Sequence, residues 1–279
     1  MFTRKACLSF ISGVLLLAPL PASAAGKGLA PHKAIYDIKM TSRHSGAQVL
    51  NISGQMYFEG KATCEAWTTE HRFKLVYEYE DTPPMRITSN FSTYETMDGH
   101  DFSFTSRRER NGQLYEELRG HATLNDKGEG EAVYSLPDGL TFDLKPGIIF
   151  PTTHTETMLE QLKGNKKFFN AHVFDGSDQE GPVAINTFIG NLVDDITAMV
   201  PDALLFDKSL ISSPAHKVRM AFFPLNKYEE EPDYEMDIIL HDNGIISDML
   251  VDYGSFSIAQ DLVALEKLDM PVCDPGKSK

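Results

Sequence analysis

The most regular feature of this chain is a two-residue alternation of apolar and polar side chains. In residues 71–79 every odd position holds an aromatic or aliphatic side chain, and three of the four even positions hold a charged one. Successive side chains of a β-strand point to opposite faces, so the pattern predicts strands with one buried and one solvated face. The same alternation recurs over residues 34–41, 234–240 and 245–253.

Short turn signals separate the alternating runs. Each is an Asn or Asp followed by Gly, a pair that tolerates the positive φ of tight hairpins. They lie at Asp98-Gly99, Asn111-Gly112, Asp138-Gly139, Asp175-Gly176 and Asn243-Gly244, with a longer turn at residues 126–128. Strands that alternate with helices are absent from the pattern. The sequence therefore predicts a mainly β protein, with a large antiparallel sheet of roughly a dozen strands or more.

One helix interrupts the strand pattern. Residues 154–163 carry an apolar stripe, Thr153 and Glu156 have the spacing of a capping box, and Gly164 suits the position after the helix. A second, weaker helix is predicted over residues 191–200, although the run before it favours a strand. The fold class is thus a β-sheet with one or two short helices.

The N-terminus has the pattern of a secretory signal peptide, predicted over residues 1–24. Two basic residues precede an apolar run at positions 8–20, and Ala22-Ser23-Ala24 fits the small-x-small cleavage rule. A transmembrane anchor is the alternative, but a spanning helix needs about 20 apolar residues and this run is shorter. We expect residues 25–279 to form one β-rich periplasmic domain, with a long loop at 201–214 and a short flexible tail.

Composition narrows the classes of partner. Loss of Arg4 and Lys5 with the leader moves the formal net charge from −14 to −16. A strongly acidic chain repels phosphate backbones, so nucleic acid is not expected as a partner, and anionic membrane surfaces are disfavoured for the same reason. No later segment is long and apolar enough to predict a membrane span.

The cysteines indicate one crosslink. Cys7 lies in the leader, which leaves Cys64 and Cys273 near the two ends of the mature chain. An exported chain with a single cysteine pair most simply forms one disulfide. Two separate thiols remain the alternative. No CxxC spacing occurs, so neither a zinc site nor a redox-active pair is supported.

His154 is the most prominent candidate for chemistry. It lies near a predicted helix N-terminus, where a neutral imidazole is favoured. As a general base it would need a nucleophile and an orienting carboxylate, and the chain contains no nucleophile elbow. The alternative is a histidine that hydrogen-bonds a neighbouring strand. A hydrolase that uses His154 is therefore a hypothesis, and we predict no catalytic residue.

No cofactor or metal site is predicted. The nine histidines are scattered, with no HExxH motif. Residues 175–181 resemble a calcium loop superficially, but they lack the ligand positions of an EF-hand and fit an acidic hairpin turn better. No glycine-rich phosphate loop occurs.

The aromatic residues allow a carrier function. A rolled sheet of this size can enclose an apolar cavity for a lipid or another hydrophobic ligand. Residues that would line it are Phe73, Tyr77, Phe91, Phe102, Phe104, Phe222 and Phe223. The alternative is that they form ordinary core.

A set of short motifs, in order and spacing, resembles a known family. They are Leu29 to Asp37, Cys64-Glu65-Ala66-Trp67, Tyr94 to Gly99, Phe150 to Thr155, Phe174 to Ser177, Val251 to Gly254 and Pro271-Val272-Cys273. Together they resemble the EipB-type cell-envelope integrity proteins of the alphaproteobacterial periplasm, long catalogued as a domain of unknown function. The resemblance covers nearly all of the mature chain.

The resemblance implies a periplasmic, mostly β protein rolled into a spiral or open barrel, with one disulfide that matches Cys64 and Cys273. It implies a role in envelope integrity without an established enzymatic activity, and a periplasmic partner with tetratricopeptide repeats. Trp67 and the segment around His154 match family motifs to which no role is assigned. The leading hypothesis is a non-catalytic protein that binds an envelope component or partner; a lipid carrier and a hydrolase are the alternatives.

Overall fold

The computed structural model of this chain describes residues 28–193, 207–226 and 231–273. The predicted leader and the predicted tail at 274–279 lie outside the described residues. Most of the chain that is described belongs to β-strands, which confirms the mainly β prediction.

The first eight strands follow one another as a meander. They are β1 (His32–Arg43), β2 (Val49–Ala62), β3 (Ala66–Tyr79), β4 (Thr82–Thr96), β5 (Asp101–Arg110), β6 (Gln113–Leu124), β7 (Gly130–Leu136) and β8 (Thr141–Leu144). The remaining strands are β9 (Ile148–Ile149), β10 (Phe168–Val173), β11 (Val183–Leu192), β12 (Ala215–Pro224), β13 (Tyr234–His241), β14 (Ile246–Asp252) and β15 (Phe256–Lys267). The helices are α1 (Pro151–Lys163) and α2 (Lys208–Ile211).

All fifteen strands form one continuous sheet, in which the first strand pairs with the last. β1 lies antiparallel to β15, with His32 opposite Lys267, so the meander returns to its own start. The edges of the sheet are β8 and β9, and these two strands are consecutive in the chain. Every pair is antiparallel except β9 with β10. The predicted rolled antiparallel sheet is therefore confirmed as a nearly closed, barrel-like roll.

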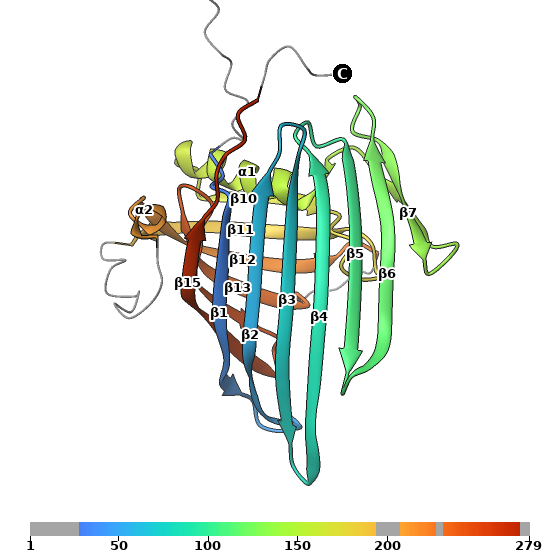
Figure 1. Ribbon diagram of the computed structural model, residues 1–279, viewed down its shortest axis with the longest axis vertical. Helices are drawn as coiled ribbons and strands as arrows, with labels where there is room; N and C mark the ends of the chain where they lie inside the picture. The colour runs from blue at the N-terminus through green and yellow to red at the C-terminus, as the bar shows by residue number, and fades with distance from the viewer. Residues whose placement is uncertain (1–27, 194–206, 227–230, 274–279) are drawn as a thin grey trace, which may run out of the picture.

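The roll brings two sets of strands face to face (Figure 1). β1 to β6 run along the length of the molecule, β10 to β13 cross behind them, and α1 lies across the upper end. One hydrophobic cluster joins α1 to β1, β2 and β10 to β15. A second cluster lies under β5 to β8 and includes the fully buried Phe102 and Phe150. Sheets that twist strongly pack in this crossed manner because side chains from both inner faces interdigitate.

Most of the predicted turns connect adjacent strands as expected. Asn111-Gly112 joins β5 to β6 directly, and both residues adopt positive φ. The prediction of a tight hairpin at Asp175-Gly176 is wrong, because residues 174–182 form a long connection between β10 and β11. Gly176 has φ +65, and a Cβ there would come within 2.4 Å of the Phe104 ring. The glycine therefore lets this connection pack against the β5 to β8 cluster.

The predicted helix at 154–163 is confirmed within α1, and Gly164 directly follows its last residue as predicted, but the predicted capping box is wrong. The N-cap residue is Phe150, which makes no side-chain capping hydrogen bond. At the other end Gly164 has an ordinary φ of −77, and Asn165 adopts the left-handed conformation instead. The N-terminus of α1 is capped by Glu95, a residue distant in sequence.

The strand prediction before residue 191 is confirmed by β11, which ends at Leu192. Residues 194–200 of the predicted second helix lie outside the described residues. Within the predicted loop at 201–214, α2 occupies residues 208–211, and residues 201–206 are outside the described part. Asp207 caps α2, since its side chain accepts a hydrogen bond from the backbone N–H of Ser209.

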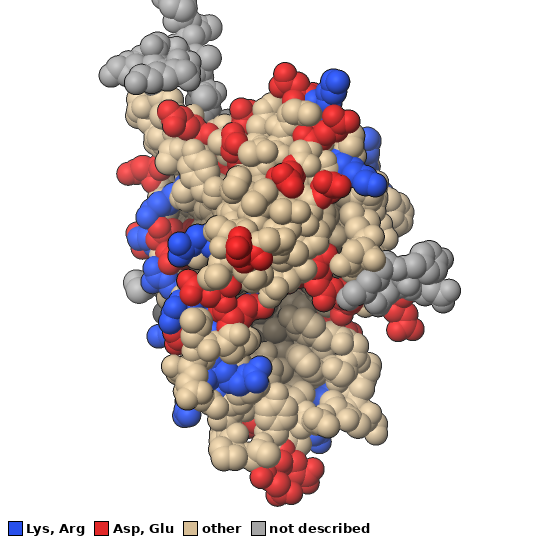
Figure 2. Space-filling view, turned by 90° about the vertical axis from the view of Figure 1, so that its right-hand side faces the viewer, with Lys and Arg blue, Asp and Glu red and all other residues tan. Residues whose placement is uncertain are grey.

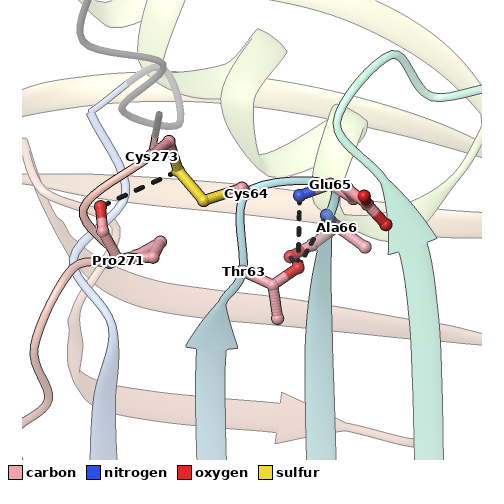
Figure 3. Close-up of a disulfide and its surroundings, with 6 residues drawn as sticks. All are labelled: Thr63, Cys64, Glu65, Ala66, Pro271 and Cys273. Carbon is pink, nitrogen blue, oxygen red and sulfur yellow. Dashed lines mark hydrogen bonds between the residues drawn. A yellow bond between two sulfur atoms is a disulfide. The ribbon is translucent and has the colours of Figure 1, made fainter. Parts of the chain in front are cut away.

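The disulfide between Cys64 and Cys273 is present, with a sequence separation of 209 and a Cα–Cα distance of 5.5 Å. It joins the β2–β3 turn to the segment after β15 (Figure 3). β15 is not a sheet edge, because β1 and β14 flank it. The bridge spans β1, which lies between β15 and β2, and so fixes the place where the two chain ends of the roll meet.

Candidate ligand-binding interior

A pocket of about 210 Å³ lies inside the roll, between α1 and the inner faces of β10 to β14. Its apolar lining is Pro151, Met158, Val173, Ile185, Met220, Phe222, Ile238, Leu240 and Ile246. The polar contributions come from His154, Thr155 and Asp175. A mostly apolar concavity with a few polar groups is the usual form of a small-molecule site.

His154 is the central polar group of this pocket. Its side chain is buried, with 7 % exposure, and its Nε2 atom has no hydrogen-bond partner. Burial lowers the pKa of His154 to about 4, so the ring is neutral at neutral pH. The Nε2 atom of His154 makes no hydrogen bond to a neighbouring strand, unlike in the alternative interpretation of this histidine. A neutral imidazole nitrogen without a partner can accept or donate one hydrogen bond.

α1 is held in place over this interior by Glu95 of β4. The Glu95 carboxylate accepts hydrogen bonds from the backbone N–H groups of Thr152 (2.6 Å) and Thr153 (2.8 Å), and from Thr153 Oγ1 (2.6 Å). The side chain is only 2 % exposed, and burial raises its pKa above the ordinary value although these hydrogen bonds oppose the shift. A carboxylate at a helix N-terminus satisfies free N–H groups and complements the helix dipole.

Replacing Glu95 with alanine is expected to lower the free energy of unfolding by about 3 kcal/mol, because two buried N–H groups lose a charged acceptor. Chemical denaturation with urea measures this change. Glu65→Ala, an exposed glutamate at the same end of the sheet, is the matched control and should change stability by less than about 0.5 kcal/mol. Equal stability of the Glu95→Ala variant and the original protein would show that the hydrogen bonds between Glu95 and α1 do not stabilise the fold.

Trp67 lies directly opposite Glu95 on the neighbouring strand β3. It is 4 % exposed, and its indole Nε1 has no hydrogen-bond partner. Cross-strand neighbours on one face of a sheet contact one another, so Trp67 packs beside the Glu95 side chain. Trp67 does not belong to the lining of the pocket.

An aromatic series extends from the pocket along the interior. Phe222, which lines the pocket, stacks on Tyr234 at 4.3 Å between ring centroids; Tyr253 follows at 5.8 Å and Phe256 at 5.1 Å. Burial raises the pKa of Tyr77 of β3 to about 12. The aromatic series therefore leads from the buried Phe222 to the surface at Tyr253, which is 43% exposed.

The interior is open on one side. β3 and β4 have 14 and 15 residues, whereas β13 and β14, which lie across from them, have 8 and 7. The long strands therefore extend beyond the strands that cover them, and Phe73, Leu75 and Tyr77 are only half-buried although they pack against the core cluster. Figure 2 shows the surface hollowed about midway along the side that faces right in Figure 1.

The seven aromatic residues proposed to line a cavity do not act as one set. Phe102 and Phe104 are fully buried in the second cluster, and Phe91 packs against it, so these are ordinary core. Phe222 lines the pocket. Phe223 alternates with it on β12 and therefore lies on the outer face of the sheet. Phe73 and Tyr77 belong to the half-buried inner face.

The residues that resembled a calcium loop are joined by local hydrogen bonds. Asp175 accepts from the backbone N–H of Ser177, and Asp178 accepts from that of Glu180. The Tyr134 hydroxyl and the Arg108 guanidinium donate to backbone carbonyls of this loop. Among the described residues, no group of three His, Cys, Asp or Glu side chains is placed to hold a metal ion.

Comparison with known proteins gives one consistent answer. The family model described as EipB-like matches residues 23–269. The chain is 31% identical over 265 residues to the cell envelope integrity protein EipB of Brucella abortus (strain 2308), which covers 92% of this chain and 89% of that protein. It also superposes on the crystal structure of a beta-barrel-like protein of a domain of unknown function from Brucella abortus. That match has a TM-score of 0.78 and 30% identity, and it covers 86% of this chain and 99% of the other.

Within the described part of the chain, no helix is long and apolar enough to cross a membrane.

Proposed function

Because this chain belongs to the EipB-like family, we propose that it supports the integrity of the cell envelope from the periplasm, by binding and without catalysis. The predicted leader at residues 1–24 would export it, and the disulfide is consistent with an oxidising compartment. The bound species is an envelope component or a partner protein.

The observation that carries this proposal is the pocket beneath α1. Its lining is mostly apolar, and its one buried imidazole has an unpaired Nε2. A histidine general base of a hydrolase faces the nucleophile hydroxyl with one ring nitrogen. Nε2 of His154 is hydrogen-bonded to no such group, so the geometry favours a binding site over a hydrolytic one.

Deletion of the gene is expected to sensitise the bacterium to detergents and cell-wall antibiotics, and the wild-type gene should restore resistance. His154→Gln keeps a hydrogen-bonding side chain in the pocket but removes the general base, so it should also restore resistance. Survival curves on a detergent series measure both effects. Normal resistance of the deletion strain would contradict the envelope role, and failure of His154→Gln, with normal protein levels, would favour the hydrolase.

A carrier of a lipid or another hydrophobic ligand is the second candidate, and a specific feature favours it. The pocket is smaller than the roughly 300 Å³ of a typical ligand site, so it would hold the end of an acyl chain rather than a whole lipid. The half-buried aromatic series beginning at Phe222 offers an apolar path for the rest of the chain. The hollow on the open side gives a route for entry.

A further inference from the structure

The outer face of β10 to β12 carries large apolar side chains that the fold leaves exposed. Phe168 is 71% exposed, Leu192 is 55% exposed and Phe188 is 42% exposed. The two phenylalanine rings lie 4.8 Å apart, as cross-strand neighbours of β10 and β11. Shallow grooves of about 460 and 590 Å³ run beside these side chains. Contiguous exposed apolar side chains on a secreted protein mark an interaction surface.

Cationic side chains lie beside this apolar group. Lys166 and Lys167 are exposed on the connection from α1 to β10, immediately before Phe168. Lys167 Nζ donates to the Gly190 carbonyl at 3.2 Å, which places it beside Phe188 and Leu192. Lys217 lines the same groove. We call Lys166, Lys167 and Lys217, together with Phe168, Phe188 and Leu192, the Lys-Phe face.

Two acidic side chains of the described residues line these grooves. Asp237 forms an ion pair of 2.7 Å with Arg219, and Glu235 lies on the adjoining groove with Arg219. The three lysines and Arg219 outnumber these two carboxylates, so the described part of the Lys-Phe face is locally positive on a chain whose formal net charge is −14. At physiological ionic strength, charges more than about 8 Å apart are largely screened from one another. The net charge of the protein therefore acts mainly at long range, whereas the lysines of the face determine the electrostatic attraction once that face touches an anionic surface.

We propose that the Lys-Phe face docks on the surface of an anionic phospholipid bilayer. Lysine stems lie along apolar surface while their ammonium groups reach phosphates, and aromatic side chains favour the bilayer interface. Each lysine near an anionic surface strengthens binding about fivefold. The lysine ammonium is a compact charge on a flexible side chain, so it can follow lipid headgroups as they move. Recognition of one protein partner favours arginine instead, whose planar guanidinium forms bidentate hydrogen bonds. Binding by one such face is weak and reversible.

Flotation with lipid vesicles tests the proposal. The intact mature protein should float with vesicles of phosphatidylcholine and phosphatidylglycerol, should float poorly with phosphatidylcholine alone, and should release at high salt. Lys166→Glu/Lys167→Glu should weaken binding roughly 30-fold or more. Phe168→Ser/Phe188→Ser should weaken binding to the same vesicles while leaving its salt dependence in place.

Lys127→Glu/Lys145→Glu is the matched control, since these exposed lysines lie on other loops and the substitution changes the net charge equally. It should bind as the original protein does. The proposal is overturned if the original protein does not float with anionic vesicles, or if the control loses as much binding as the Lys-Phe variant. Absence of vesicle binding, together with loss of envelope resistance in Lys-Phe variants, would assign this face to a protein partner instead.

Discussion

Replacement of Cys64 with serine is expected to lower the free energy of unfolding by several kcal/mol under oxidising conditions. The bridge closes a loop of 209 positions, and the loss of chain entropy in the unfolded state is worth on the order of 5 kcal/mol in the simple model. For a domain of this size each kcal/mol corresponds to about 2–4 °C, so the melting temperature should fall by roughly 10 °C or more. Differential scanning calorimetry measures the change.

Two comparisons separate the effect of losing the disulfide bond from the effect of replacing the Cys64 side chain. Cys64→Ser/Cys273→Ser should melt at the same temperature as the single variant, because either change removes the same bond. The original protein treated with a reductant should approach that value. An unchanged melting curve in all three samples would contradict the account of a roll whose ends are joined by the disulfide.

Acidification from pH 7 to pH 5 is expected to destabilise the fold through two buried histidines, His32 and His154. Burial lowers the pKa of each to about 4, although the Ala30 carbonyl partly opposes the shift at His32. The unfolded chain takes up these protons near pH 6.5, so it binds more protons than the folded protein between pH 6.5 and 4, and stability falls as the pH falls. At pH 5 each histidine costs about 2 kcal/mol, and the loss is complete below pH 4.

A variant without these two imidazoles isolates their contribution. In His32→Gln/His154→Phe the difference in unfolding free energy between pH 7 and pH 5, measured by urea denaturation, should be smaller than in the original protein by about 4 kcal/mol. Burial also lowers the pKa of the half-buried His71 to about 4. This residue is unchanged in both proteins, so its contribution cancels in the comparison. Equal pH dependence in the two proteins would mean that neither histidine is held neutral by burial.

Much of the fold follows from local sequence signals. Alternation at residues 71–79 and the turn at Asn111-Gly112 both report backbone geometry over a few residues, and both predictions are confirmed. The pairing of β1 with β15 has no such local signal, because it joins chain ends whose contacts are set by the curvature of the whole sheet. Of the sequence signals, only the positions of Cys64 and Cys273 indicated that the first and last strands of the chain lie together.

The candidate site was less accessible from the sequence. His154 was identified because of its place near a helix start, but its unpaired Nε2 depends on the strands that pack around it. Glu95 was missed entirely: the local spacing of Thr153 and Glu156 suggested a cap within the helix, whereas the actual acceptor comes from β4. Its one available signal was an acidic residue at an inward-facing strand position, opposite Trp67.

The claim that the protein acts by binding at the pocket beneath α1 is tested most directly by mass spectrometry of the protein isolated without detergent from its own envelope. The account predicts that the original protein carries a small envelope component, and the carrier function predicts that this component is hydrophobic. Ile246→Trp, which fills the pocket, should be folded and empty, whereas Phe223→Trp on the outer face of the sheet should retain the ligand. An original protein with no bound molecule, or equal occupancy in Ile246→Trp, would contradict the account.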